Sequence, residues 1–197
     1  MNAPRTAKVE RTTGETRIRL ALDLDGGPVA IATGLAFFDH MLMQLARHGG
    51  LGLEVEASGD LAVDGHHLVE DVGLCLGDAL KAALGERAGI ARFGEAHVPL
   101  DEALARVVVD LSGRPWCRFD ASMPPLILGN GFHPELAREF FIAFAQRGGM
   151  ALHAAVLYGE NTHHQLEALF KALAVALKRA LRKEGDGIPS TKGTLTV

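Results

Sequence analysis

Cysteine and basic charge are both scarce in this 197-residue chain, and each shortage excludes a class of protein. Its two cysteines, Cys75 and Cys117, cannot build the disulfide framework of a small secreted domain, so we expect a reducing, cytoplasmic location. The formal charge of −4 argues against a nucleic-acid partner, because proteins that bind nucleic acids usually carry a basic excess. The longest apolar run is too short to span a membrane, and the N-terminus lacks the apolar core of a signal peptide.

The apolar pattern predicts the same order of elements in both halves of the chain. Strands are expected where apolar and polar residues alternate or where valines cluster, at residues 16–26, 51–60, 106–115 and 150–160. Helices are expected where apolar residues recur at helical spacing, at residues 37–50, 66–85, 136–149 and 163–181. Strands that are mixed along the chain with two helices per half are typical of an α+β fold.

The two halves align closely enough to indicate an internal duplication. Gly49 aligns with Gly148 at an offset of 99 residues, and His66 aligns with His163 at an offset of 97. One strand-to-helix connection is therefore two residues shorter in the second half. We expect a single catalytic domain over residues 1–197, made of two pseudo-equivalent βα repeats, at roughly 1–95 and 96–197, packed as one unit.

The most specific pattern is His-His-x-x-Glu, which occurs at residues 66–70 and again at residues 163–167. Residues four apart lie on one face of a helix, so the first histidine and the glutamate of each copy can bind one ion. The second histidine, His67 or His164, is turned by about 100° and would reach a different ion. Imidazole and carboxylate ligands suit manganese, iron, cobalt, nickel or zinc.

The repeat alignment adds one more candidate ligand to each predicted site, because His40 aligns with Glu139 at the offset of 99. The sequence then predicts two groups of four: His40, His67, His163 and Glu167 in one, and Glu139, His164, His66 and Glu70 in the other. A His/Glu pair on an exposed helix can also be a simple surface interaction. Two copies in register favour a paired metal site over that alternative.

A few further residues could bind an anion or move a proton. The tail around Ser190 and Lys192, flanked by glycines, suits a phosphate, although it could also be a polar C-terminal turn. Arg92 and Arg114 lie in glycine-flanked turns, where the guanidinium can either bind phosphate or remain solvated. Glu15 has no local pattern that separates it from a surface acid.

Taken together, six segments of this sequence resemble imidazoleglycerol-phosphate dehydratases, in the same order and with similar spacing. They are TGLAFFDHMLMQLARHGG, DGHHLVEDVGLCLG, GIARFG, PLDEALARVVVDLSGRP, GENTHHQLEALFKAL and PSTKGTL. The resemblance implies a duplicated α+β fold like domain 2 of ribosomal protein S5. It also implies two manganese ions per active site and a homo-oligomer of twenty-four subunits, with active sites at the subunit interfaces.

The resemblance implies an activity as well: imidazole glycerol phosphate loses water to give imidazole acetol phosphate in histidine biosynthesis, through a metal-bound imidazolate. No carbonyl acidifies the carbon proton, so metal ions that lower the pKa of the ring would assist its loss. The implied roles are as follows: phosphate binding by Arg92, Arg114, Ser190 and Lys192; substrate contacts from Gln44 and His48; acid/base chemistry at Glu15; and active-site positions at Asp101 and Lys171.

One position departs from the family pattern, since Glu139 stands where these enzymes often have histidine. We expect Glu139 to bind metal through its carboxylate instead. Two other functions fit the paired motif. A dinuclear hydrolase would use metal-bound hydroxide on phosphate esters, whereas a metal-storage cage would bind metal without turnover. Neither a membrane nor a nucleic acid is expected as a partner.

Overall fold

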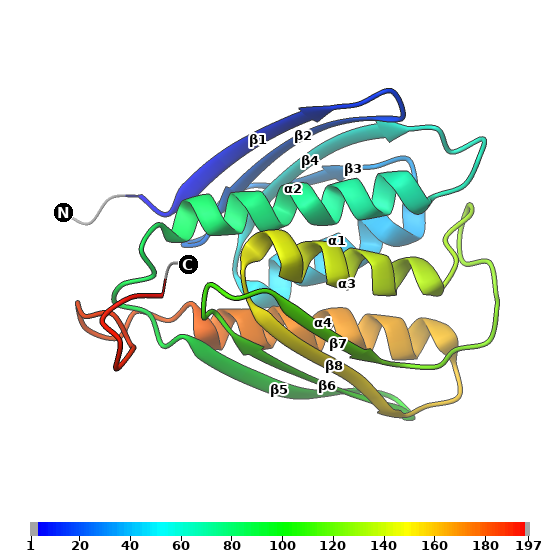
Figure 1. Ribbon diagram of the computed structural model, residues 1–197. Coiled ribbons are helices and arrows are strands. Elements are labelled where there is room, and N and C mark those ends of the chain that lie inside the picture. Colours follow the sequence, from blue (N-terminus) through cyan, green and yellow to red (C-terminus); the bar gives the residue numbers. More distant parts are fainter. Residues whose placement is uncertain (1–3, 196–197) are drawn as a thin grey trace.

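The computed structural model describes residues 4–195, so the two ends of the expected 1–197 domain lie outside the described residues. Its first half contains β1 (Thr6–Thr12), β2 (Thr16–Asp23), β3 (Val29–Ala32), α1 (Ala36–Gly49), β4 (Gly52–Gly59) and α2 (His66–Leu84). Its second half contains β5 (Phe93–Leu100), β6 (Ala103–Asp110), β7 (Trp116–Asp120), α3 (Glu135–Gly148), β8 (Ala151–Tyr158) and α4 (Thr162–Ala180). The four helices form a layer between two sheets (Figure 1).

The two sheets have the same topology, which confirms the α+β fold with a duplicated module. Their strand orders are β1-β2-β4-β3 and β5-β6-β8-β7. In each sheet the last neighbours, β3 with β4 and β7 with β8, are parallel, and the other pairs are antiparallel. Each half therefore repeats the same strand order and the same combination of antiparallel and parallel pairs, as a duplication predicts.

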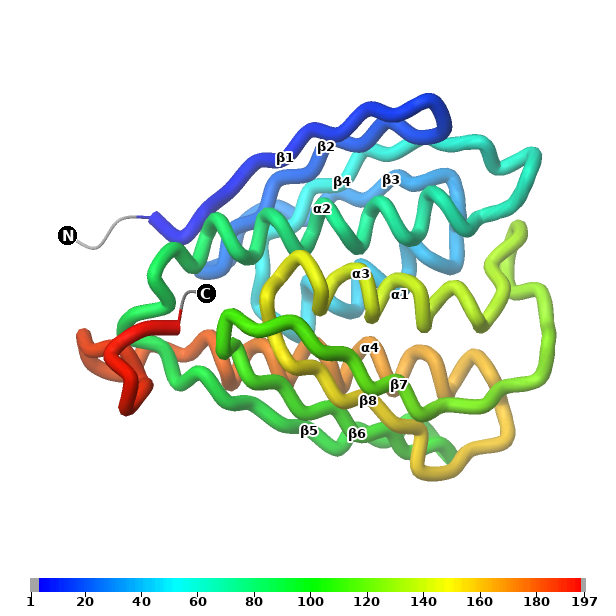
Figure 2. Tube along the Cα trace, viewed as in Figure 1, coloured from blue at the N-terminus to red at the C-terminus, as the bar shows by residue number. Residues whose placement is uncertain are grey.

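The helices pair across the two halves. α1 packs against α4, and α2 packs against α3, so each long helix meets the short helix of the other half. Gly73 and Gly77 allow α2 and α3 to approach closely, because a Cβ at Gly77 would lie 2.7 Å from the Cβ of Arg147. This pairing of helices between the two halves matters for function, because it brings the beginning of each long helix next to residues from the other repeat (Figure 2).

Burial explains which strands could be predicted. The central strands β2, β4, β6 and β8 alternate between buried and exposed residues, as on β2, where Ile18 and Leu20 are buried and Arg17 and Arg19 are exposed. The four strands that were not predicted, β1, β3, β5 and β7, are the edges of the two sheets. Edge strands are more polar and more exposed, which weakens the apolar alternation in their sequences.

The predicted helix ends agree with the structure. α1 ends at Gly49 and α3 at Gly148, and the glycine that follows each helix is left-handed, with φ of 69° at Gly50 and 61° at Gly149. Glycine adopts this conformation without steric penalty, which is why the Gly-Gly pair is a reliable helix stop. Among residues 4–195, no helix is both long and apolar enough to cross a membrane.

Candidate metal centre and active site

One group of metal-competent side chains is assembled within the chain, where the start of α4 meets α1. His40 Nε2 and His163 Nε2 each lie 3.0 Å from Glu167 Oε2. The ligand atoms of these three residues all lie within 4.8 Å of one another. Two imidazoles and a carboxylate are a donor set that first-row divalent ions accept, so manganese fits the residues present.

Glu167 is nearly buried, and it is held as a carboxylate. Burial alone would raise its pKa, but hydrogen bonds from Lys171, His40 and His163 outweigh burial and lower the pKa to about 2. The ammonium of Lys171 lies 2.6 Å from the second carboxylate oxygen, one helical turn further along α4. The group therefore has an ionised ligand with one cation already beside it.

The substrate-contact candidates continue this group along α1. Gln44 Nε2 lies 3.5 Å from His40 Nε2, and Gln44 Oε1 lies 3.0 Å from His48 Nε2. Burial lowers the pKa of His48, and the nearby charge of Lys171 lowers it further. His40, Gln44, His48 and Lys171 thus form one polar row along the contact between α1 and α4.

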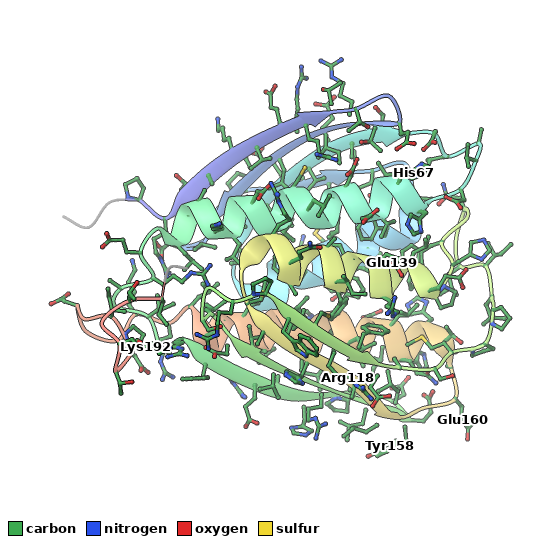
Figure 3. The ribbon with its side chains drawn as sticks, in the orientation of Figure 1. His67, Arg118, Glu139, Tyr158, Glu160 and Lys192 are labelled. Atoms are coloured by element: carbon green, nitrogen blue, oxygen red, sulfur yellow. The ribbon has the colours of Figure 1, made fainter. Side chains whose placement is uncertain are left out.

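The second predicted group lies between α2 and α3 and is more open. His66 Nε2 is 3.7 Å from Glu70 Oε2, and Glu139 accepts a hydrogen bond of 3.1 Å from its neighbour Arg138. Over residues 4–195, no second set of three ligand atoms is as close as the first group. Glu139 lies on α3, which packs against α2, and whether it binds metal stays a prediction (Figure 3).

The two remaining histidines of the motifs do not join either group within the chain. His67 Nδ1 lies 3.0 Å from Asp60, and its Nε2 lies 3.8 Å from Glu15. His164 Nδ1 lies 2.7 Å from Glu102, and its Nε2 lies 3.9 Å from Asp101. Within one chain, therefore, at most three residues of each predicted group of four come together. The fourth ligand of each group stays a prediction.

Asp60 and Glu102 are functional candidates that were missed in the sequence. A carboxylate on Nδ1 fixes the tautomer and orientation of a histidine and leaves Nε2 for a metal. The same hydrogen bonds raise the pKa of His67 and of His164. Glu102 could have been found from the repeat, since it immediately precedes β6 as Glu15 immediately precedes β2.

Local capping orients the motif histidines at both helix starts. The side chain of Asn161 accepts hydrogen bonds from the backbone N–H groups of His163 and His164. At the other helix, Asp64 accepts from the backbone N–H of His66 at 2.8 Å. These caps satisfy N–H groups that have no partner inside the helix.

The phosphate-binding candidates lie at the opposite end of the molecule. Arg92 donates to Asp110 through Nε at 2.7 Å and to the carbonyl of Pro189 through Nη1 at 2.8 Å, which ties the tail carrying Ser190 and Lys192 to this end. Arg114 is exposed in the loop between β6 and β7. Figure 3 shows Lys192 at one end, with His67 and Glu139 toward the other.

Comparison with known proteins identifies the family. A family model described as imidazoleglycerol-phosphate dehydratase matches residues 33–177. The chain is 55% identical to imidazoleglycerol-phosphate dehydratase from Magnetococcus marinus over 98% of both chains. It is 52% identical to the enzyme from Halorhodospira halophila, covering 98% of this chain and 100% of that one.

Solved structures agree with the sequence comparison. Imidazoleglycerol-phosphate dehydratase from Staphylococcus aureus matches with a TM-score of 0.82 at 38% identity, over 90% of this chain and 99% of that one. The enzyme from Pyrococcus furiosus, in complex with (S)-C348, also matches with a TM-score of 0.82, at 39% identity over 94% and 99%. The chain therefore belongs to the imidazoleglycerol-phosphate dehydratase family and is a hydro-lyase of histidine biosynthesis.

Proposed function

We propose that this chain converts imidazole glycerol phosphate to imidazole acetol phosphate with two manganese ions in each active site. The observation that carries the metal dependence is the meeting of His40, from one repeat, with His163 and Glu167, from the other. A surface His/Glu pair alone would not require a third ligand from the other half of the chain. Family membership supports the dehydration itself.

The two ligand sets are those expected from the duplication. His40, His163 and Glu167 would hold one ion with a His67, and His66, Glu70 and Glu139 would hold the other with a His164. Because His67 and His164 lie apart from these groups in one chain, we propose that they come from a neighbouring copy. Manganese held by these residues would lower the pKa of the imidazole nitrogens of the substrate, and this would favour loss of its hydroxyl group.

The protein residues carry the proton transfers. Glu15 is an exposed carboxylate, so it can remove the carbon proton of the substrate as a general base. Lys171 is a cation beside the first ligand group and is proposed to assist departure of the hydroxyl. Asp101, in the turn of the β5–β6 hairpin, faces His164 Nε2 as Glu15 faces His67 Nε2, and we propose it as a second active-site carboxylate.

The separation of the two binding regions supports an assembly. Arg92 donates its backbone N–H to the carbonyl of Ala180, the last residue of α4, which is about 20 Å from Glu167 at roughly 1.5 Å per helical residue. The three-carbon chain and ester oxygen between ring and phosphate span on the order of 6 Å, at about 1.5 Å per single bond. This difference in length supports binding of the two ends of the substrate by different copies of the chain.

We therefore propose that Arg92, Arg114, Ser190 and Lys192 of one copy bind the phosphate of a substrate whose ring lies in the metal centre of another copy. A homo-oligomer of twenty-four subunits with interfacial active sites is the proposed assembly. The proposed location is the cytoplasm, which is compatible with the two free cysteines, Cys75 and Cys117.

The test compares wild type with His40→Ala, each stripped of metal and refilled with manganese. Wild type should dehydrate imidazole glycerol phosphate and leave p-nitrophenyl phosphate intact, and His40→Ala should lose one bound manganese and most of its turnover. His97→Ala, on the exposed face of β5, is the matched control and should keep both. Hydrolysis of the ester without dehydration would indicate a dinuclear hydrolase, and metal binding without either reaction would indicate a storage cage.

A further inference from the structure

A buried carboxylate next to the second ligand pair is not explained by metal binding. Asp71 follows Glu70 on α2, but its side chain turns inward and the residue is only 7% exposed. A buried charge is unfavourable unless it is paired and hydrogen-bonded. Its partners are Arg11, which donates through Nε to Oδ1 at 2.9 Å, and Thr16, which donates through its hydroxyl to Oδ2 at 2.5 Å. Both partners lie on the β1–β2 hairpin, one on each side of Glu15.

The hydrogen bonds continue from Asp71 into the loop that carries Glu15. A hydroxyl has one proton, and Thr16 donates its proton to Asp71. In the 3.2 Å contact between the two hydroxyls, Thr13 must therefore be the donor and Thr16 the acceptor. The lone pairs of Thr13 then accept the backbone N–H groups of Glu15 at 3.1 Å and of Thr16 at 2.9 Å. The carboxylate of Asp71 thus sets the direction of the hydrogen bond between the two hydroxyls and leaves the lone pairs of Thr13 to the backbone N–H groups of Glu15 and Thr16.

The far side of the loop is held as well. The carbonyl of Glu15 accepts a 3.1 Å hydrogen bond from the backbone N–H of Asp60, the residue whose side chain holds His67. The Glu15 side chain is 55% exposed, and its carboxylate lies 3.8 Å from His67 Nε2. The backbone of Glu15 is therefore fixed from both sides while its carboxylate stays open to a ligand.

The second repeat shows that the fold itself does not need this buried charge. The residue five positions after His163, equivalent to Asp71, is Ala168, which is fully buried. The β5–β6 hairpin has only Asp101 and Glu102 between the paired residues Leu100 and Ala103, so its register fixes the turn. The loop of the first hairpin has four residues between the paired residues Thr12 and Arg17, so more of its backbone has to be ordered by other contacts.

We propose that Asp71 is a positioning residue that holds the Glu15 carboxylate in place through Thr16 and Thr13. The proposal rests on the proposed function, because it takes Glu15 as the acid/base group. An asparagine at this position cannot accept from both Arg11 and Thr16, since one of its two terminal atoms is a donor. The loop would then lose the bond directions that orient Glu15.

The experiment measures kcat and KM for dehydration in Asp71→Asn, Thr16→Val and Thr16→Ser, and combines Asp71→Asn with Glu15→Gln. Asp71→Asn and Thr16→Val should lower kcat by about 10- to 100-fold, the effect of misplacing a catalytic group by about 1 Å, with KM changed less than about threefold. Thr16→Ser keeps the hydroxyl and should restore most of kcat. Manganese content should equal that of wild type in all variants.

The double variant separates positioning from general destabilisation. If Asp71 acts only through Glu15, Asp71→Asn should lower the residual rate of Glu15→Gln by less than about twofold, because residues that act as one unit are not additive. An equal loss in both backgrounds, or a wild-type kcat in Asp71→Asn and Thr16→Val, would overturn the proposal while Glu15 keeps its role. A wild-type rate in Glu15→Gln would instead contradict the role of Glu15 in the proposed function, and the Asp71 proposal with it.

Discussion

Replacing Gly77 with alanine tests how closely the α2–α3 pair is packed. The new Cβ would lie 2.7 Å from both Arg147 Cβ and the backbone nitrogen of Gly148, and 2.8 Å from the carbonyl oxygen of Phe144. None of these atoms is the end of a flexible side chain, so the helices must separate. Overpacking costs about 1–3 kcal/mol, and three approaches under 3.0 Å to atoms that cannot swing away place this site in the upper part of that range, at about 2–3 kcal/mol. Alanine recovers about 1 kcal/mol of helix propensity, which leaves a net loss of about 1–2 kcal/mol.

The assay is equilibrium urea unfolding of the metal-free protein, with Gly187→Ala as the control because a Cβ there meets no atom within 4 Å. For a chain of this length the loss corresponds to a Tm lower by about 2–8 °C. Since α2 and α3 carry Glu70 and Glu139, manganese titration should show one weakened site. The site at His40, between α1 and α4, should be unchanged. Unchanged stability, or equal weakening of both sites, would refute this reasoning.

Further predictions concern the helix cap, the buried ion pair and the cysteines. Asn161→Ala removes the acceptor for two backbone N–H groups of α4 and should lower the free energy of unfolding by about 1 kcal/mol, whereas Asn161→Asp should not. Lys171→Met removes the ammonium 2.6 Å from Glu167 and should lower the stability of the metal-free protein by about 1.5–3 kcal/mol. The folded-state pKa of Glu167 is lowered from 4.5 to about 2. The difference in unfolding free energy between wild type and Lys171→Met should therefore have its whole value above pH 4.5 and disappear as the pH falls toward 2, as measured by urea unfolding across that range. Burial raises the pKa of the Cys75 and Cys117 thiols to about 11, so both should react slowly with a disulfide reagent at neutral pH and rapidly in urea; fast labelling of the folded protein would contradict this.

The duplication made much of the fold predictable. The Gly-Gly stops and the repeated helical spacing placed α1 and α3 to within a residue or two, because these signals depend only on local conformation. The central strands alternate between a buried and an exposed face, which leaves a clear pattern in the sequence. The edge strands alternate too, but most of their inward-facing residues are only partly buried and several are alanine or glycine, which weakens the apolar signal.

The site was predictable where it depends on helix geometry. His163 and Glu167 meet because they are four residues apart on α4, and His40 was found because the repeat aligns it with Glu139. The contacts of His67 and His164 were not predictable from helix geometry, and only Glu102 had a signal in the repeat, through its alignment with Glu15. Asp60 and Glu102 reach these rings from the segment after β4 and from a hairpin turn, and local spacing says nothing about such contacts. Asp71 was hidden for the same reason, since its partners lie on the distant β1–β2 hairpin.

The most direct test of the account is the rate of imidazole glycerol phosphate dehydration as manganese is added back to metal-stripped protein. We expect no turnover without metal, a rate that saturates at two equivalents per chain, and a Glu15→Gln variant that binds two equivalents without comparable turnover. Full activity of the stripped protein, saturation at one equivalent, or no dehydration by fully loaded wild type would contradict it.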